Sequence, residues 1–450
     1  MKRSFPSSFL FGTATSATQV EGHCTTSDWY DFASQPGRVN NGDAPHPACD
    51  VWHRFEQDVD LIKDFGYNAH RFSIEWARIE PSPGRFDDDA IERYRRMLGA
   101  LRDASIAPMV TLLHFSLPQW IANQGGFLNP SFASLFERFV NRSVERLGDL
   151  VDRWVTINEP NVTAALGYFV GIFPPGHRRP WQAWRAQEAM LDAHARAYRA
   201  IHERAGRCGW NAEVGVAHHL RVVEPWDSSS PTDRWASDLF EQTFNRAFLN
   251  ALCGLELSRA ERSMLALTRT KRRDVRDTHD FFGLNYYGRF KVRVGRNGTY
   301  GIPIKLEASP GAEISDVGWE VYPEGLGRFL REWSERCGRP VYVTENGIAD
   351  SRDAQRASFL VRHLAQVADA MQDGVDVRGY FHWSLLDNFE WTEGYEPRYG
   401  LVEMQADTLN RCPRPSAAVY GQIASKKEID DGLWEQYGTV PERAWRAGGV

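Results

Sequence analysis

Two short segments of this sequence each end an apolar run with a glutamate and a turn residue. The first is Thr156-Ile157-Asn158-Glu159-Pro160, and the second is Val343-Thr344-Glu345-Asn346-Gly347. Apolar, β-branched runs are typical of buried parallel strands, which deliver polar side chains to the rim of an α/β domain. Two glutamates that face each other across a cleft can supply the two carboxyl groups that cleavage of a glycosidic bond requires.

The strands that would position these glutamates recur along the whole chain. Eight short apolar runs are predicted as strands: Phe9–Ala17, Ala69–Ile74, Pro108–Leu113, Trp154–Ile157, Glu213–His218, Phe281–Tyr286, Val341–Thr344 and Gly379–Leu385. Amphipathic helices are predicted between them, over Phe55–Phe65, Ile91–Ala104, Ser131–Leu147, Trp181–Arg204, Thr232–Asn250, Gly325–Arg336 and Ser351–Gln372. Apolar residues at helical spacing support these helices.

This alternation predicts parallel strands joined by right-handed helical crossovers. Eight such units favour a closed (β/α)8 TIM barrel with its active site at the C-terminal ends of the strands. The sequence has no linker-like low-complexity run, so we expect residues 1–450 to form a single barrel domain. The segment 291–316 is rich in glycine, proline and polar residues, and is predicted to be a loop excursion over the barrel mouth.

Polar residues cluster at the predicted strand ends. They are Gln19, Glu21, Arg71, His114, Asn158, Glu159, Asn285, Tyr287, Glu345, Asn346 and Trp383, followed by the run Glu390 to Tyr395. Each has an ordinary structural explanation when taken alone: a glutamate after a strand is usually solvated, and a tryptophan usually packs in a core. Their coincidence at the ends of so many strands favours a catalytic site.

Composition excludes several classes of partner. The chain has 450 residues, 42% of them hydrophobic, and a net charge of −6 without a basic stripe, so no nucleic-acid partner is expected. Its longest apolar stretches are too short to span a bilayer, so no membrane association is expected. The basic run Lys271-Arg272-Arg273 is interpreted as a solvated turn. The oligomeric state is left open.

The cysteines and histidines show no metal-binding pattern. The six cysteines are scattered, at Cys24, Cys49, Cys208, Cys253, Cys337 and Cys412. We therefore expect reduced thiols in a cytoplasmic protein, with neither a zinc site nor a disulfide framework. His218 and His219 are adjacent on a predicted strand, so they should point to opposite faces and make poor joint ligands.

Six segments in order resemble those of family 1 glycoside hydrolases, which are retaining β-glucosidases and β-glycosidases. They are the segments from Phe11 to Gly22, from His70 to Trp76, from Asn158 to Pro160, from Gly283 to Tyr287, from Thr344 to Gly347 and from Trp383 to Trp391. The resemblance runs from Phe9 to about Tyr420. It implies a β-glycoside or oligosaccharide substrate, and no metal or cofactor is expected.

The resemblance also implies roles for individual residues. Glu159 would be the general acid/base and Glu345 the nucleophile, with Arg71 and Tyr287 keeping Glu345 ionised. Glu159 would be protonated near neutral pH. Asn285 would complete the catalytic group. The residues implied to bind the sugar are Gln19, His114, Asn158, Trp383, Glu390, Trp391 and Tyr399.

The chain departs from the family pattern at three positions near the sugar. Phe115 and Ser116 stand where many members have tryptophan and aspartate, so one indole donor to the sugar is lost. Tyr399 stands where phenylalanine is common, which adds a hydroxyl group. These changes favour relaxed discrimination between sugars, with β-glucosides accepted together with β-galactosides or β-fucosides.

Three alternative functions are weighed against the residues present. A 6-phospho-β-glycosidase usually has serine where Glu390 stands, because a carboxylate would repel the phosphate. A thioglucosidase typically replaces the acid by glutamine. A catalytically inactive barrel that binds carbohydrate or protein would lose one of the two glutamates, and both are present here.

Overall fold

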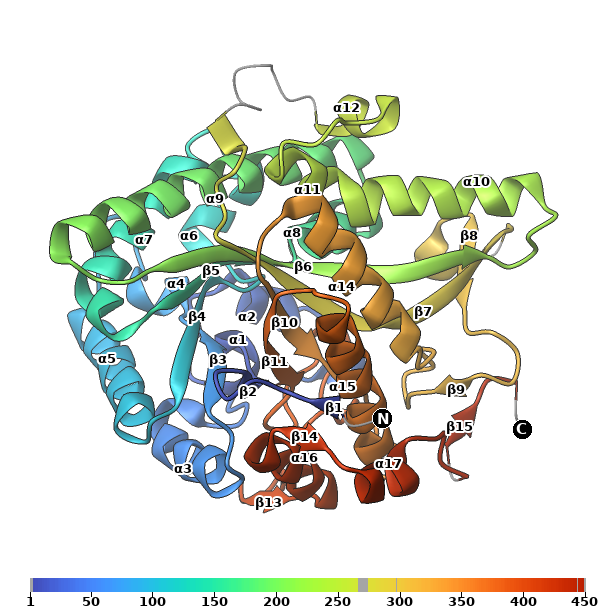
Figure 1. Ribbon diagram of the computed structural model, residues 1–450. Coiled ribbons are helices and arrows are strands. Elements are labelled where there is room, and N and C mark those ends of the chain that lie inside the picture. Colours follow the sequence, from blue (N-terminus) through green and yellow to red (C-terminus); the bar gives the residue numbers. More distant parts are fainter. Residues whose placement is uncertain (1–2, 266–273, 297, 443, 449–450) are drawn as a thin grey trace.

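A computed structural model describes residues 3–265, 274–296, 298–442 and 444–448 of the protein. Eight parallel strands close into a barrel (Figure 1), because β11 pairs with β2 and β10 also pairs with β7. The barrel strands are β2 (Leu10–Ala14), β3 (Ala69–Ser73), β4 (Ala107–Leu113), β5 (Arg153–Asn158), β6 (Glu213–Pro225), β7 (Phe281–Val294), β10 (Val341–Asn346) and β11 (Val377–Trp383). All eight predicted strands and the TIM barrel are confirmed.

Helices cover the outside of the barrel, as Figure 1 shows. They include α3 (Val51–Asp64), α5 (Asp88–Asp103), α7 (Phe132–Leu147), α9 (Pro180–Cys208), α10 (Pro231–Phe240), α11 (Ala247–Leu252), α14 (Pro323–Cys337) and α15 (Arg356–Gln372). The apolar stripe of the helix predicted over Ser131–Leu147, which is α7, is buried, with Phe132, Phe136 and Phe139 fully enclosed. The single helix predicted over Thr232–Asn250 is instead α10, the π-helix η5 (Glu241–Arg246) and α11.

The barrel interior is filled by one side chain from each strand. These are Ala14, Ala69, Met109, Val155, Ala217, Phe281, Tyr342 and Phe381, which form one buried cluster. Small residues make room for the large ones: a Cβ on Gly12 would lie 2.6 Å from the Phe381 ring, and one on Gly215 would lie 2.5 Å from the Phe281 ring. The barrel is therefore a packed core rather than a pore.

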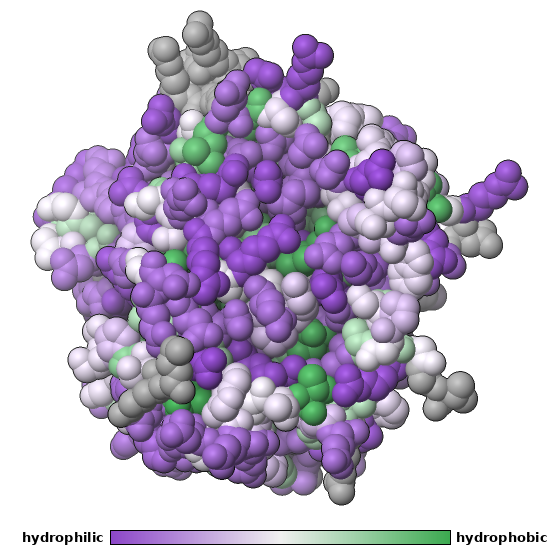
Figure 2. All heavy atoms as spheres, turned by 45° about the vertical axis from the view of Figure 1, so that its right-hand side comes forward, coloured by the Kyte–Doolittle hydropathy of each residue, from purple (hydrophilic) through white to green (hydrophobic). Residues whose placement is uncertain are grey.

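Shorter elements connect and cap the barrel. The short α-helices are α1 (Ala17–Val20), α2 (Asp28–Ala33), α4 (Trp76–Ile79), α6 (Gln119–Ala122), α8 (Pro160–Ala164) and α12 (Arg259–Leu265), followed near the C-terminus by α16 (Pro415–Lys426) and α17 (Asp431–Tyr437). Three small antiparallel pairs join β1 (Arg3–Ser4) to β14 (Glu428–Ile429), β12 (Val402–Met404) to β13 (Arg411–Pro413), and β9 (Glu313–Ile314) to β15 (Trp445–Arg446). The face seen in Figure 2 is mainly hydrophilic, with hydrophobic side chains in small separate groups.

Two predictions about local structure need correction. The segment 291–316 is not only loop, because β7 extends to Val294 and pairs antiparallel with β8 (Ile304–Glu307). The expectation of reduced cysteines is also wrong, since Cys253 and Cys337 form a disulfide. The basic run Lys271-Arg272-Arg273 lies outside the described residues. Within the described ranges, no helix is long and apolar enough to cross a membrane.

Candidate active site

The predicted site residues lie together at the C-terminal ends of the barrel strands. Arg71 is in β3, Asn158 ends β5, Asn285 and Tyr287 are in β7, Glu345 is in β10 and Trp383 ends β11. Gln19 lies in α1, His114 directly follows β4, Glu159 follows β5, and Glu390, Trp391 and Tyr399 follow β11. Every member of this set is buried to at least nine-tenths except Glu390, whose exposure is intermediate.

Arg71 organises the centre of the site. Its Nη1 donates to Glu345 Oε1 at 2.7 Å, and its Nη2 donates to Asn158 Oδ1 at 2.6 Å. Its Nε donates to Thr111 Oγ1 at 3.0 Å. The other Glu345 oxygen accepts from the Tyr287 hydroxyl at 2.7 Å. Both oxygens of Glu345 are therefore held by donors, which fixes the carboxylate in one orientation.

Asn285 connects this centre to the second glutamate. Its Nδ2 donates to Glu159 Oε1 at 2.9 Å and to Asn158 Oδ1 at 3.1 Å. The Thr344 hydroxyl donates to Asn285 Oδ1 at 2.7 Å, which determines the orientation of the amide. One buried hydrogen-bond network thus joins the two glutamates, so a change at one is transmitted to the other.

His219 is a member of the site that the sequence did not single out. Its Nδ1 lies 2.9 Å from Glu159 Oε1, and its ring stacks on Tyr287 with the centroids 5.7 Å apart. A signal was present in the sequence, because adjacent histidines on a strand must point to opposite faces. His218 points outward and stacks on Phe248, which leaves His219 facing the site.

The charge state of the two glutamates differs from the expected one. Burial raises the pKa of Glu345 to about 7; the Arg71 charge opposes this rise, and the negative Glu159 adds to it. Burial also acts to raise the pKa of Glu159, but the charge and hydrogen bond of His219, the Asn285 hydrogen bond and the Arg71 charge together outweigh it, so this pKa is lowered. The interacting carboxyls titrate as a pair. Burial lowers the pKa of His219. The ion pair between His219 and Glu159 weakens once His219 has lost its proton.

Three non-glycine residues around the site adopt left-handed backbone conformations. Glu159 has φ 44°, Phe115 has φ 68° and Trp391 has φ 57°. Large side chains rarely adopt this region, and such strain is held at functional sites by the surrounding structure. Pro160 begins α8 immediately after Glu159, so the strand ends abruptly with the carboxyl turned into the site.

Aromatic rings and one acid form the rest of the site. His114 stacks on Trp383 and on Trp391, with centroids 5.8 and 6.1 Å apart, and its Nε2 lies 3.1 Å from Asn158 Nδ2. The Trp383 indole donates to Glu390 Oε1 at 3.3 Å. Burial raises the pKa of Glu390 to about 8, so this group holds a proton near neutral pH and can donate as well as accept.

The structure also shows the contacts of Gln19 and of two residues that depart from the family pattern, Tyr399 and Ser116. The Gln19 amide donates to Asn388 Oδ1 and to the Phe389 carbonyl, each at 2.8 Å. Tyr399 packs edge-on against Tyr287, with centroids 6.1 Å apart. The Ser116 hydroxyl donates to both oxygens of Glu75, at 3.0 and 2.8 Å, which an aspartate at this position could not do.

Metal chemistry is not what these residues are arranged for. Two groups of side chains among the described residues could hold a metal ion, and neither includes a member of this site. The site offers instead two buried carboxyl groups, one held by an arginine and a tyrosine and the other by an amide and a histidine. That arrangement suits covalent and acid–base chemistry between the glutamates.

Comparison with known proteins decides the family. The profile of Glycosyl hydrolase family 1 matches residues 1–429. The chain belongs to glycosyl hydrolase family 1. The family 1 chain is 33% identical over 452 residues to "Beta-glucosidase A" from Thermotoga maritima, covering 95% of this chain and 99% of that one. It is 31% identical to a "Beta-galactosidase" from Saccharolobus solfataricus, covering 97% and 98% of the two chains.

Solved structures agree with this assignment. The family 1 β-glucosidase from Thermotoga maritima superposes with a TM-score of 0.88 at 32% identity, over 96% of this chain and 100% of that one. A β-glycosidase from Pyrococcus horikoshii superposes with a TM-score of 0.85 at 37% identity, over 98% and 99% of the two chains. The family 1 chain therefore shares the whole barrel with these enzymes.

Proposed function

We propose that this protein is a retaining β-glycosidase in which Glu345 is the nucleophile and Glu159 the acid/base. It would hydrolyse terminal non-reducing β-D-glucosyl residues of small glycosides or oligosaccharides. The observation that carries the proposal is the pair of buried glutamates in one hydrogen-bond network, with both oxygens of Glu345 held by Arg71 and Tyr287 at 2.7 Å. Membership of glycosyl hydrolase family 1 supports it.

The reactive form of the coupled pair carries its proton on Glu159 and leaves Glu345 ionised. In the first step, Glu345 attacks the anomeric carbon while Glu159 protonates the leaving oxygen. The bond to the aglycone breaks, and an ester forms between the sugar and Glu345. Arg71 holds Glu345 in place for the attack and interacts with its negative charge before the ester forms. Asn285 and His219 hold Glu159 toward the leaving group, because both contact the same oxygen of that carboxyl.

In the second step, Glu159 takes a proton from water, which displaces the sugar from Glu345. The negative charge of Glu345 is absent from the ester, and that charge had favoured a protonated Glu159. Glu159 therefore loses its proton more readily in the intermediate than in the free enzyme. This change suits the switch from acid to base within one catalytic cycle.

Sugar recognition is assigned to the aromatic and polar residues around the two glutamates. Trp383 would lie beneath the sugar ring, and Asn158, which accepts from Arg71, would bond the 2-hydroxyl. His114, Trp391 and Glu390 would bond the other hydroxyls. Gln19 would join them, although its amide donates within the protein to Asn388 and Phe389. Tyr399 would lie near the C6 end of the sugar.

Proton NMR of the first-formed product tests the proposal. With an aryl β-glucoside as substrate, we expect the β-anomer of glucose to appear first and the α-anomer to grow only by mutarotation. Two displacements at the same carbon give this result. Release of the α-anomer would contradict the proposal, because water would then attack directly and Glu345 would act as a base.

The sugar range forms a second part of the proposal. Glu390, in its protonated or ionised form, can accept from a 4-hydroxyl of either orientation, so we expect turnover of β-galactosides and β-fucosides alongside β-glucosides. A 6-phosphoglucoside should be rejected, because Glu390 stands where 6-phospho-β-glycosidases usually have serine, and its carboxyl group disfavours a phosphate dianion. Measured kcat/KM values across aryl glycosides check both points. A higher kcat/KM for the 6-phosphoglucoside than for the glucoside would favour a 6-phospho-β-glycosidase.

A further inference from the structure

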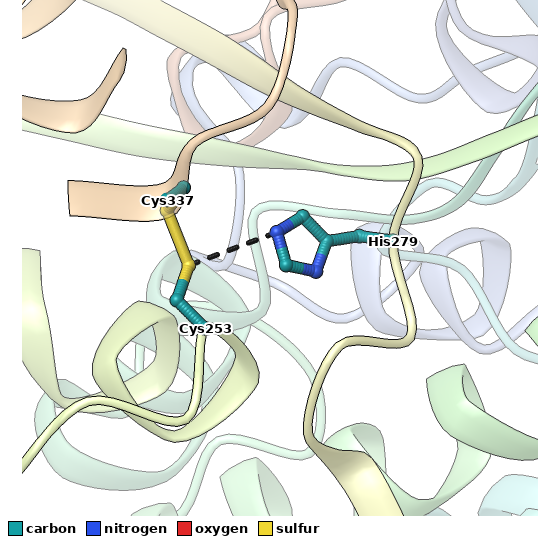
Figure 3. A group of neighbouring side chains, drawn as sticks. All are labelled: Cys253, His279 and Cys337. Carbon is teal, nitrogen blue, oxygen red and sulfur yellow. Dashed lines mark hydrogen bonds between the residues drawn. A yellow bond between two sulfur atoms is a disulfide. The ribbon is translucent and has the colours of Figure 1, made fainter. Parts of the chain in front are cut away.

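Three side chains with metal-binding atoms converge at the end of the barrel opposite to the active site. Cys253 directly follows α11, Cys337 is the last residue of α14, and His279 lies two residues before β7 begins. The two cysteines are 84 residues apart in sequence and form a disulfide, with their Cα atoms 5.4 Å apart. Figure 3 shows the His279 ring directed at the two sulfur atoms, with its Nε2 lying 3.8 Å from Cys253 Sγ.

His279 has no strong partner within the protein. The residue is 1% exposed, and its Nδ1 has no hydrogen-bond partner among the described residues. Among the described residues, the hydrogen-bond partner of Nε2 is the Cys253 sulfur, which is a weak acceptor. A buried imidazole that is directed at two sulfurs and bonded to nothing else is an unusual arrangement, because buried polar groups are normally satisfied.

We propose that Cys253, Cys337 and His279 bind a zinc ion once the disulfide is reduced. A thiol or phosphine reductant supplies two electrons, the sulfur–sulfur bond breaks, and two protons complete the two thiols. Zinc then binds the two thiolates and the Nε2 lone pair of His279, and both thiol protons pass to solvent. Water fills the fourth position of the tetrahedron.

The geometry and the charges fit this ion. Zinc–sulfur bonds of about 2.3 Å and zinc–nitrogen bonds of about 2.0–2.1 Å place sulfur and nitrogen ligands about 3.6 Å apart in a tetrahedron. The observed separation of Nε2 and Cys253 Sγ is 3.8 Å. Two thiolates neutralise the double charge of the ion, so the complex is neutral, which a half-buried site tolerates. Thiolate and imidazole ligands favour zinc or copper(I) over magnesium or calcium.

Redox state selects between the two forms of this cluster. In a reducing compartment Cys253 and Cys337 would be thiols. In an oxidising medium the disulfide ties the same two helix ends together. Either cross-link joins α11 to α14, and the two states exclude each other because they use the same sulfur atoms.

Zinc titration of the full-length protein against a chromophoric chelator tests the proposal. A second group, His23, Asp50 and His53, could hold zinc without any reductant, so all proteins carry His53→Ala. After reduction with a phosphine under inert gas, we expect one additional zinc per chain compared with the oxidised protein. Cys253→Ser, Cys337→Ser and His279→Asn should each weaken this binding at least tenfold.

The matched control is Cys208→Ser, since Cys208 is an exposed free thiol outside the cluster. This variant should bind the additional zinc unchanged. Cobalt(II) in place of zinc should give thiolate charge-transfer absorption that Cys253→Ser weakens and Cys208→Ser does not. Turnover of an aryl β-glucoside confirms that each variant is folded. Equal zinc binding by the reduced and oxidised proteins, or unchanged binding by His279→Asn, would overturn the proposal.

Discussion

At the residue scale, the ionisation of Glu159, the proposed acid/base, depends on its contact with His219. His219 lies 2.9 Å from Glu159 Oε1, and its charge and hydrogen bond lower the pKa of that carboxyl. The Arg71 charge acts in the same direction, whereas burial acts in the opposite one. Asn285 remains as a donor to the same oxygen when His219 is removed.

His219→Phe should therefore raise the pKa of Glu159 while keeping the aromatic stacking on Tyr287. A lowered pKa returns to a higher value when the lowering group is lost, so Glu159 stays protonated to higher pH. We expect the alkaline limb of the kcat/KM profile to move upward, by about one pH unit for the loss of one charge-assisted hydrogen bond. His218→Phe is the control, because His218 stacks on Phe248 on the outer face. A downward shift, or equal shifts in both variants, would contradict this role.

The positions of several site residues could be anticipated because they follow from the strands. Glu159 and Glu345 end apolar runs, and parallel strands bring such ends to one edge. His219 was not anticipated as a partner of Glu159, because the contact joins β6 to the end of β5 across the site. The raised pKa of Glu390 was not anticipated either, since it arises mainly from burial, which a linear sequence does not show.

At the element scale, the strand ends are held together by close backbone approaches. A Cβ on Gly347, which directly follows β10, would lie 1.8 Å from the carbonyl oxygen of Trp383 at the end of β11. Only Asn346 lies between Glu345 and Gly347. The spacing of the two strand ends thus sets the position of Glu345 relative to the tryptophan proposed to lie beneath the sugar.

Gly347→Ala should push these two strand ends apart. We expect kcat/KM for an aryl β-glucoside to fall at least tenfold, because displacing reacting groups by about 1 Å costs on the order of a hundredfold. Thermal stability should also decrease. Gly99→Ala is the control: Gly99 lies inside α5 with open space around it, so alanine should leave activity unchanged and stabilise the helix by about 1 kcal/mol. Equal activities in the two variants would show that the approach at Gly347 has no influence on the site.

The elements themselves were predictable to different degrees. The eight strands could be read from apolar runs, since burial on both faces leaves a continuous hydrophobic signal. The extension of β7 to Val294 depends on pairing with β8, which is a tertiary contact. The π-helix η5 interrupts a helix whose apolar pattern continues through it, so periodicity alone predicted one unbroken helix.

At the scale of the whole molecule, the candidate active site and the disulfide lie at opposite ends of the barrel. The candidate catalytic residues lie at the C-terminal ends of the strands, whereas the Cys253–Cys337 disulfide lies near the starts of β7 and β10. Sequence could not predict this pairing, because scattered cysteines whose partners are 84 positions apart carry no connectivity signal. That residues 1–450 form one domain stays a prediction.

Because the disulfide and the candidate active site lie at opposite ends of the barrel, we expect loss of the disulfide to lower stability without changing activity. Under oxidising, metal-free conditions, the double variant Cys253→Ser/Cys337→Ser should lose about 2–5 kcal/mol of stability, since the cross-link no longer restricts the unfolded chain. Its kcat/KM at 25 °C should equal that of the parent protein. Thermal unfolding and steady-state kinetics measure the two effects. A large loss of kcat/KM in a folded double variant would show that the two ends are coupled.

The roles of the two glutamates are tested most directly by azide rescue of Glu345→Gly and Glu159→Ala on a β-glucoside with an activated phenol. Without Glu345, azide can occupy the space of the nucleophile and attack once, so the account predicts an α-glucosyl azide. Without Glu159, the ester with Glu345 still forms and azide replaces water in the second displacement, so a β-glucosyl azide is predicted. Proton NMR distinguishes the anomers. The reverse pairing of anomers and variants, or water-supported turnover by Glu345→Gly at the parent rate, would contradict the assignment.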